Sequence, residues 1–88
     1  MKRKELLDEA AKITEGERQD HYGTPEYSFG KIAKMWNAYT GVTNFKDYDV
    51  AAMMILLKVA RIASDPAHLD SWIDTAGYAS CGGEIVSG

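Results

Sequence analysis

The apolar residues of the chain fall into four stretches with helical spacing, and the third is the most continuous. Residues 49–63 read DVAAMMILLKVARIA, contain no Gly or Pro, and consist mainly of good helix formers. Apolar side chains cover nearly the whole circumference of such a helix, so we expect it to be surrounded by protein. In its second half only Lys58 and Arg61 are charged, and their spacing of three residues places them on one face. These two cations need anionic partners, either protein carboxylates or an anionic ligand.

Two further helices are predicted before this central stretch. Residues 4–14 carry apolar side chains at three- and four-residue spacing, and Gly16 should end that helix. Thr24 followed by Pro25 is a helix-start signal, in which the hydroxyl caps the helix and proline takes the first helical position. We expect the second helix to run from Pro25 to about Tyr39, with Gly41 closing it.

A fourth helix should follow the central one after a short link. Asp65 and Pro66 repeat the signal of a cap followed by proline, so this helix should begin within residues 65–70. Gly82 and Gly83 should end or fray it. No window alternates polar and apolar residues for long enough to predict a strand. The pattern therefore predicts an all-α fold, a compact bundle of about four helices.

The length of the chain favours a small domain completed by self-association. Eighty-eight residues should form a single domain, residues 1–88, and so short a chain hides a small share of its surface, so we expect a homo-oligomer. Hydrophobic residues make up 45% and charged residues 26% of the chain, which is ordinary for a globular protein. The formal net charge of -3 lacks the basic excess that binding to nucleic acid polymers requires.

Cysteine usage and the N-terminal residues favour a cytoplasmic protein. The single cysteine, Cys81, allows no intramolecular disulfide and no thiolate metal cluster, and we expect it to be a small core residue. The N-terminus meets Asp8 and Glu9 before any sustained apolar run, unlike a signal peptide. Residues 50–57 are too short a run to span a bilayer, so we expect no membrane partner.

The fourth predicted helix gathers polar groups on one side. Asp70, Asp74, Gly77, Tyr78 and Cys81 are separated by three or four residues. Gly77 costs about 1 kcal/mol in a helix interior relative to Ala, which indicates close approach of either another helix or a ligand. Consecutive helices joined by a short link tend to be antiparallel, so the two aspartates should face the two cations of the central helix. The four charges could form an ion-pair network, bind phosphate oxygens through the cations, or hold a divalent metal ion through the aspartates.

The loop RQDHYGT, residues 18–24, is the second candidate for ligand binding. It gathers the side chains of Arg18, His21 and Tyr22 before Gly23, and loops rich in polar and aromatic groups commonly carry binding function. Tyr22 could stack on a base. The alternative is that His21 and Tyr22 only pack against the end of the bundle.

The sequence has no glycine-rich phosphate loop, no His-x-x-x-His or Cys-x-x-Cys spacing and no nucleophile triad, so we predict no catalytic residue.

Three stretches, RQDHYGTPEYSF, VAAMMILLKVAR and DSWIDTAGYA, resemble a family of small bacteriophage proteins of unknown function. The order of a Tyr-Gly motif, a Lys-x-x-Arg helix and an Asp-x-Ala-Gly-Tyr-like helix is also similar to the phage nucleotide-modification-associated domain. It is more remotely similar to the MazG-like all-α NTP pyrophosphohydrolases. That last resemblance implies Mg²⁺ held by two acidic pairs, of which only the second can be placed here, on Asp70 and Asp74 with a spacing of four rather than three. Lys58 and Arg61 stand where the first pair would lie, which favours phosphate binding over hydrolysis.

Together these features predict a small phage-type nucleotide-binding protein that needs no cofactor. It could sequester a nucleotide, including a cyclic nucleotide immune signal, as a counter-defence sponge. A Mg²⁺-dependent nucleotide pyrophosphohydrolase with its metal on Asp70 and Asp74 is the first alternative, and a structural or partner-binding helical module is the second. The predicted ligand contacts are Arg18, His21, Tyr22, Lys58, Arg61, Asp70, Trp72, Asp74 and Tyr78.

Overall fold

The chain folds into four long helices and one short one. The computed structural model describes the backbone of all 88 residues and the side chains of all except Glu17 and Arg18. Within that description there is no strand, so the predicted all-α fold is confirmed, and no helix is long and apolar enough to cross a membrane. The helices are α1 (Arg3–Thr14), α2 (Glu17–Tyr22), α3 (Pro25–Thr40), α4 (Asp47–Ser64) and α5 (Leu69–Ser87).

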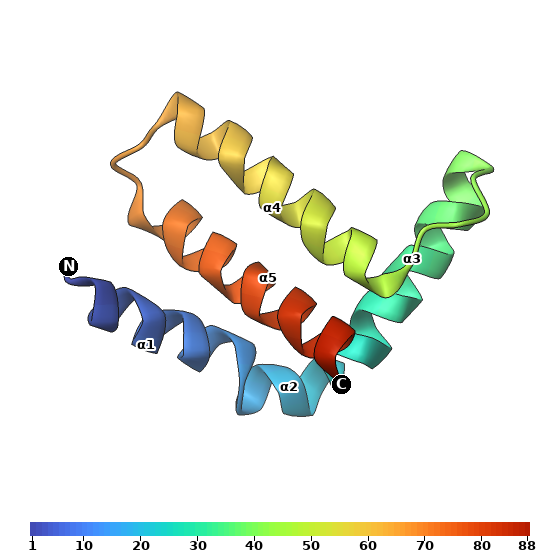
Figure 1. Cartoon of the computed structure of the whole chain (residues 1–88), viewed down its shortest axis with the longest axis horizontal. Helices are drawn as coiled ribbons and strands as arrows, with labels where there is room; N and C mark the ends of the chain where they lie inside the picture. The colour runs from blue at the N-terminus through green and yellow to red at the C-terminus, as the bar shows by residue number, and fades with distance from the viewer.

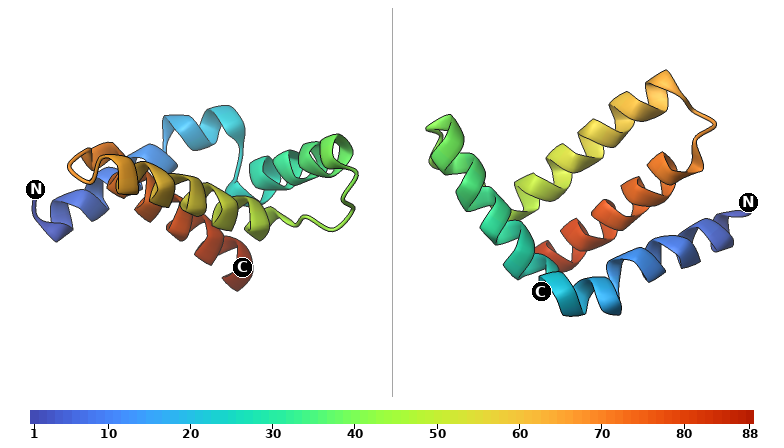
Figure 2. Two further views of the ribbon diagram at one scale, coloured as in Figure 1. Left: turned by 90° about the horizontal axis from the view of Figure 1, so that it is seen from above. Right: turned by 180° about the vertical axis from the view of Figure 1, so that it is seen from behind.

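Three of the long helices form a layer with α5 in its middle (Figure 1). α5 packs against α4 on one side and against α1 on the other. α4 and α5 are antiparallel, as predicted, whereas α1 and α5 run in the same direction (Figure 1). α2 and α3 lie on one side of this layer, and the other side carries no helix (Figure 2). The molecule is consequently flat, with extents of 41 × 30 × 22 Å.

Glycines with positive φ set the boundaries of the short helix α2. The prediction of a loop at residues 18–24 was wrong, because most of that stretch belongs to α2. Gly16 has a φ of 62° where the chain leaves α1, and Gly23 has a φ of 89° where α2 ends. Only glycine adopts such angles without strain. Thr24 then caps α3 as predicted, since its side-chain oxygen accepts a hydrogen bond from the Tyr27 amide at 3.4 Å.

Side-chain hydrogen bonds fix the connection between α3 and α4. Gly41, with a φ of 78°, closes α3 in the left-handed conformation. The Asn37 side-chain amide donates to the Phe45 carbonyl at 3.2 Å, and the Phe45 amide donates to Asn37 Oδ1 at 3.0 Å. Asp49 accepts a hydrogen bond from the Lys46 amide at 2.9 Å, which satisfies a backbone donor at the start of α4. These contacts set where α4 begins relative to α3.

Glycines also let the neighbours of α5 approach closely. α5 continues through Gly82 and Gly83, so the prediction that these residues end or fray the helix was wrong. A Cβ atom at Gly82 would lie 3.2 Å from Ala51 Cβ of α4, and one at Gly77 would lie 3.2 Å from Thr14 Cγ2 of α1. Gly82 and Gly77 therefore serve close packing on the two flanks of α5.

The hydrophobic core of the single chain is small and covers only one side of α4. Its buried apolar residues are Ala10, Ala33, Val50, Ala51 and Cys81. Cys81 is thus a core residue, as predicted. The expectation that α4 would be surrounded by protein was wrong for one chain, because Leu56 is 66% exposed and Val59 is 49% exposed. α4 packs against α3 and α5 only on its inner side.

Candidate functional site

Two neighbouring hollows share the side chain of Asp74. The first is a cavity of about 250 Å³ lined by Ile13, Thr14, Gln19, Tyr22, Gly23, Pro25, Ser28, Phe29, Ile32, Asp74, Gly77, Tyr78 and Cys81. The second is an open depression of about 630 Å³ lined by Leu57, Lys58, Ala60, Arg61, Ser64, Asp65, His68, Asp70, Ser71 and Asp74. The cavity lies among α1, α2, α3 and α5, whereas the depression lies where α4 passes into α5. We call them the aromatic cavity and the charged depression.

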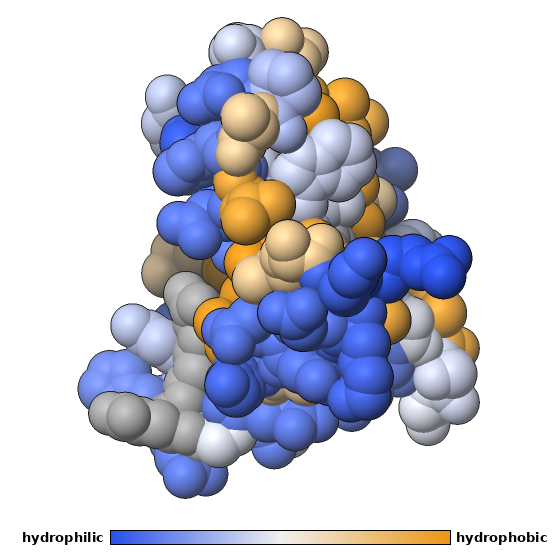
Figure 3. All heavy atoms as spheres, turned by 90° about the vertical axis from the view of Figure 1, so that its left-hand side faces the viewer, coloured by the Kyte–Doolittle hydropathy of each residue, from blue (hydrophilic) through white to orange (hydrophobic). Residues whose placement is uncertain are grey.

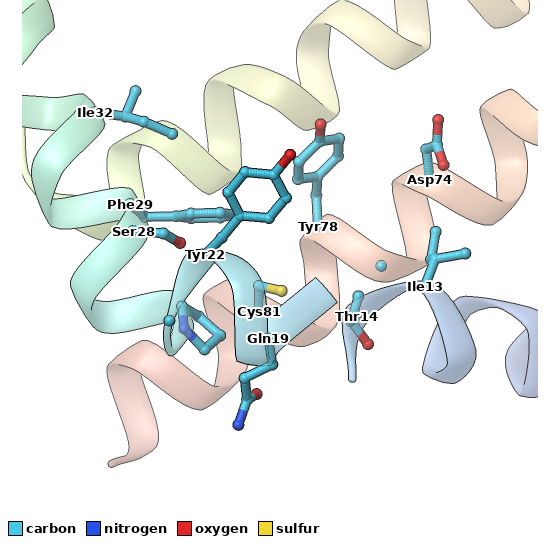
Figure 4. A pocket seen from close by; sticks show the side chains of 13 residues that line it. Ile13, Thr14, Gln19, Tyr22, Ser28, Phe29, Ile32, Asp74, Tyr78 and Cys81 are labelled. Atoms are coloured by element: carbon cyan, nitrogen blue, oxygen red, sulfur yellow. The ribbon is translucent and has the colours of Figure 1, made fainter. Parts of the chain in front are cut away.

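Aromatic rings from three different helices form one wall of the aromatic cavity. Figure 4 shows the rings of Tyr22, Phe29 and Tyr78 gathered on one side, with Ile13 and Asp74 on the other. The centroids of the Phe29 and Tyr78 rings are 6.3 Å apart and the rings are tilted by 45°. The chain changes direction at Gly16 and Gly23, on either side of α2. These turns place Tyr22, the last residue of α2, at the cavity beside residues of α3 and α5. The cavity thus offers an aromatic wall with two phenol hydroxyls, together with one carboxylate.

The charged depression contains one close ion pair and one exposed cation. Lys58 Nζ lies 2.8 Å from Asp74 Oδ2, and the side chains are 16% and 33% exposed, respectively. This contact agrees with the predicted approach of the two charged helix faces. Arg61 lines the same depression, is exposed, and forms no ion pair with any side chain that the structure describes. Asp70 is exposed there, with its Oδ2 atom 3.9 Å from His68 Nε2. The predicted network of two cations and two carboxylates therefore consists of a single direct pair.

Two of the predicted ligand contacts, His21 and Trp72, line neither hollow. His21 is exposed outside the aromatic cavity, where its ring meets Tyr22 edge-on at a centroid distance of 4.7 Å. Trp72 is 44% exposed, and its indole N–H donates to the Pro66 carbonyl at 2.9 Å. The side chain of Arg18 falls outside the described residues. The remaining predicted contacts, Tyr22, Lys58, Arg61, Asp70, Asp74 and Tyr78, line one or both hollows.

Phe29 and Ile13 line the aromatic cavity, although the sequence did not mark them as ligand contacts. Both belong to apolar stripes with ordinary helical spacing, and such a stripe looks the same whether it packs in a core or lines a cavity. The sequence left open whether a helix or a ligand comes close to Gly77. Gly77 lines the aromatic cavity, and the side chains of Thr14 and Ile13 from α1 also lie close to it. Among the side chains that the structure describes, no three His, Cys, Asp or Glu residues are grouped as metal ligands would be.

Comparison with known proteins places the chain in a phage-associated family. Residues 5–86 match the family described as "Domain of unknown function (DUF6378)". The chain is 42% identical over 76 residues to the Gene 55 protein of Mycobacterium phage D29, a match that covers 86% of this chain and 50% of the relative. It is also 42% identical over 74 residues to the Gene 55 protein of Mycobacterium phage L5, covering 84% and 47%, respectively. The chain thus spans about half the length of these curated relatives, and no solved structure matches it.

These matches confirm the resemblance of three sequence stretches to a small phage protein family of unknown function. They do not bear on the more distant similarity to the nucleotide-modification-associated domain or to MazG-like enzymes. The family match covers all five helices, apart from the first residues of α1 and the last residue of α5. The chain therefore belongs to the DUF6378 family.

Proposed function

We propose that the protein binds a small nucleotide, with the base in the aromatic cavity and a phosphate in the charged depression, and holds it without hydrolysing it. The observation that carries this proposal is that an aromatic hollow and a cationic hollow adjoin at Asp74. A nucleotide has a flat apolar end and an anionic end, so its two parts match the two hollows in chemistry. Of the eight predicted ligand contacts whose side chains the structure describes, six line these hollows.

The dimensions and lining of the aromatic cavity suit a single ring system. Its volume of about 250 Å³ is slightly below the range of roughly 300–1,000 Å³ that is usual for small-molecule sites. A base could therefore enter while its sugar and phosphate remained outside. Stacking of a base on an aromatic side chain contributes about 1–3 kcal/mol, and Tyr22 and Tyr78 offer such faces. Asp74 would accept a hydrogen bond from an exocyclic amine of the base.

The cations of the charged depression suit phosphate oxygens. Arg61 presents a planar guanidinium whose paired N–H groups match two oxygens, and it has no carboxylate to displace among the described side chains. Lys58 has three N–H donors, and the contact with Asp74 uses one of them. Asp74 would thus hold Lys58 in position while its remaining donors face the ligand.

The chemistry of the carboxylates fits Mg²⁺ poorly, which favours holding a nucleotide over hydrolysing it. Mg²⁺ demands oxygen ligands in near-octahedral geometry, but one oxygen of Asp74 already lies 2.8 Å from the Lys58 ammonium. The phage origin of the Gene 55 relatives supports a role as a sponge that sequesters a host nucleotide signal, including a cyclic nucleotide. In such a counter-defence role the nucleotide would be removed from its host receptor by binding alone.

A melting-temperature screen followed by ligand recovery tests this proposal. Mono-, tri- and cyclic nucleotides are added to the protein with Mg²⁺, and a bound nucleotide at one hundred times its Kd should stabilise the fold by about 2.7 kcal/mol. The nucleotide that raises the melting temperature is then recovered after denaturation and analysed by chromatography. Intact nucleotide supports sequestration. Released pyrophosphate would refute it and support the pyrophosphohydrolase alternative.

Arg61→Ala is the sharpest variant, because this exposed residue has no described ion pair whose loss would change stability. Binding should weaken strongly while the melting temperature of the ligand-free protein stays the same. Arg3→Ala removes an exposed arginine at the start of α1 and is the matched control, which should bind normally. Unchanged binding in Arg61→Ala would contradict the placement of the phosphate. If no nucleotide raises the melting temperature, the structural or partner-binding alternative is favoured.

A further inference from the structure

We propose that a second copy of the chain packs on the open side of the α4–α5 pair in a two-fold dimer. The surface concerned, which we call the open face, consists of one stripe of residues from each helix. The α4 stripe is Ala52, Leu56, Val59 and Ala63, and the α5 stripe is Trp72, Ala76, Ala79, Gly83 and Val86. All nine are exposed in the single chain except Ala76, which is partly buried.

The spacing within each stripe is that of a helix–helix contact. The α4 residues are separated by four, three and four positions, and the α5 residues by four, three, four and three. The average step is about 3.7 residues in α4 and 3.5 in α5, and both values lie near the 3.6 residues per turn that keep side chains on one face of a helix. None of the nine residues is charged. By contrast, the outer side of α1 carries the exposed ion pair between Lys4 and Asp8, which is what a helix side facing water usually shows.

The contacts of α5 place its stripe on the side of the layer that carries no helix. Gly77 faces α1 and Gly82 faces α4, whereas a Cβ atom at Gly83 would meet nothing within 4 Å. Gly83 therefore faces neither α1 nor α4. Since α2 and α3 lie behind the layer, Gly83 lies on the side of α5 that faces the reader in Figure 1. Figure 3 views the molecule from the left of Figure 1, so this side is its right-hand margin, where hydrophobic groups appear at several places between hydrophilic ones.

The area exposed by one chain is larger than a monomer of this size should expose. A folded monomer of 9.7 kDa is expected to expose roughly 5,100 Å², but this chain exposes 6323 Å². The excess of roughly 1,200 Å² per chain exceeds the 800 Å² or so that each partner buries in a standard stable interface. The Cα radius of gyration, 13.6 Å, is likewise above the value of about 12 Å expected for 88 residues. Covering the open face in a dimer would remove the excess.

The composition of the open face suits a second copy of itself. A two-fold axis brings the same surface from both chains together, so any charge on it would meet its own like charge nearby. The open face has no charge, and the small residues Ala76, Ala79 and Gly83 of α5 leave room for the larger Leu56 and Val59 of a partner's α4. None of the nine residues lines the aromatic cavity or the charged depression, so the dimer would leave both hollows accessible. This inference is therefore independent of the proposed nucleotide binding.

Sedimentation velocity over a dilution series tests the dimer. The wild-type chain should have twice the monomer mass, whereas Leu56→Glu and Gly83→Glu should each have the monomer mass with unchanged helical circular dichroism. Gly83→Glu is suited to this test because glutamate is a better helix former than glycine and the position has open space in the single chain. Met35→Glu on α3 is the matched control and should remain dimeric, since Met35 is 61% exposed and Leu56 is 66% exposed.

Fluorescence of Trp72 in a Trp36→Phe background gives a second measurement at the open face itself. The indole should be protected from acrylamide in the otherwise wild-type chain and become accessible when Leu56→Glu is added. A wild-type chain that stays monomeric at its highest soluble concentration would overturn the proposal. Dimers that persist in both Leu56→Glu and Gly83→Glu, with Trp72 equally accessible in all variants, would also overturn it.

Discussion

Replacing Lys58 by Met should destabilise the fold by about 1–2 kcal/mol. The change removes the ammonium that lies 2.8 Å from Asp74 but keeps an unbranched apolar stem. Breaking a fully buried ion pair costs about 3–5 kcal/mol, whereas an exposed pair contributes about 0–1 kcal/mol. Lys58 is 16% exposed and Asp74 is 33% exposed, so water can reach the abandoned carboxylate in part. The expected cost therefore lies between the two limits.

This loss of stability should be visible as a shift in melting temperature. At about 2.1 cal/mol/K per residue, 88 residues have an unfolding entropy of roughly 0.18 kcal/mol/K, so the expected shift is a decrease of about 5–10 °C. The assay is thermal unfolding followed by circular dichroism, with all variants at the same protein concentration, because self-association would make the melting temperature depend on concentration.

Two comparisons decide whether the lost ion pair is the cause. Lys4→Met breaks a pair of similar length, 3.0 Å, but its side chains are 85% and 57% exposed, so it should cost less than about 0.5 kcal/mol. Adding Asp74→Leu to Lys58→Met removes the abandoned carboxylate and should restore much of the stability. The reasoning is refuted if Lys58→Met and Lys4→Met behave alike, or if the double variant is no more stable than Lys58→Met.

Packing and loop contacts give two further predictions, both measurable by chemical denaturation. Gly77→Val should cost about 1–3 kcal/mol, because its Cβ atom alone would lie 3.2 Å from a side-chain atom of α1. Gly30→Ala, also within a helix but with open space around its Cβ position, should instead stabilise by about 0.4–1 kcal/mol, and shifts of the same sign in both variants would contradict this account. Asn37→Ala should cost about 1–3 kcal/mol through the loss of both hydrogen bonds to the Phe45 backbone. A stability equal to that of wild type would show that these bonds do not hold the α3–α4 connection.

Local signals in the sequence predicted the long helices well, and they failed where a distant contact decides the structure. The capping threonine before Pro25 and the left-handed Gly41 act within one turn of the helix, so the sequence alone locates α3. Gly82 and Gly83 read as helix-ending residues, yet α5 continues through them. Gly82 is there because Ala51 of α4 comes close, and such a contact is invisible until the two helices are placed.

In the candidate site, too, local signals predicted some contacts, and contacts between distant residues could not be predicted. The approach of Lys58 to Asp74 follows from helical spacing and an antiparallel pair of neighbouring helices, and both can be read from the sequence. The aromatic cavity could not be predicted as a whole, because α5 joins the successive helices α1, α2 and α3 in its walls only through long-range packing. Trp72 was predicted to contact the ligand, but its side chain lies outside both hollows and donates a hydrogen bond to the Pro66 carbonyl.

The central position of α5 in the layer determines the order in which the chain can assemble. α4 and α5 are neighbours in sequence and can form an antiparallel pair as soon as both exist, which favours rapid local folding. α1 packs mainly against α5, so its apolar side has no such partner until more than fifty further residues have been synthesised. α1 therefore leaves the ribosome well before α5 does, and its apolar side remains open to premature association or to chaperones until α5 is made.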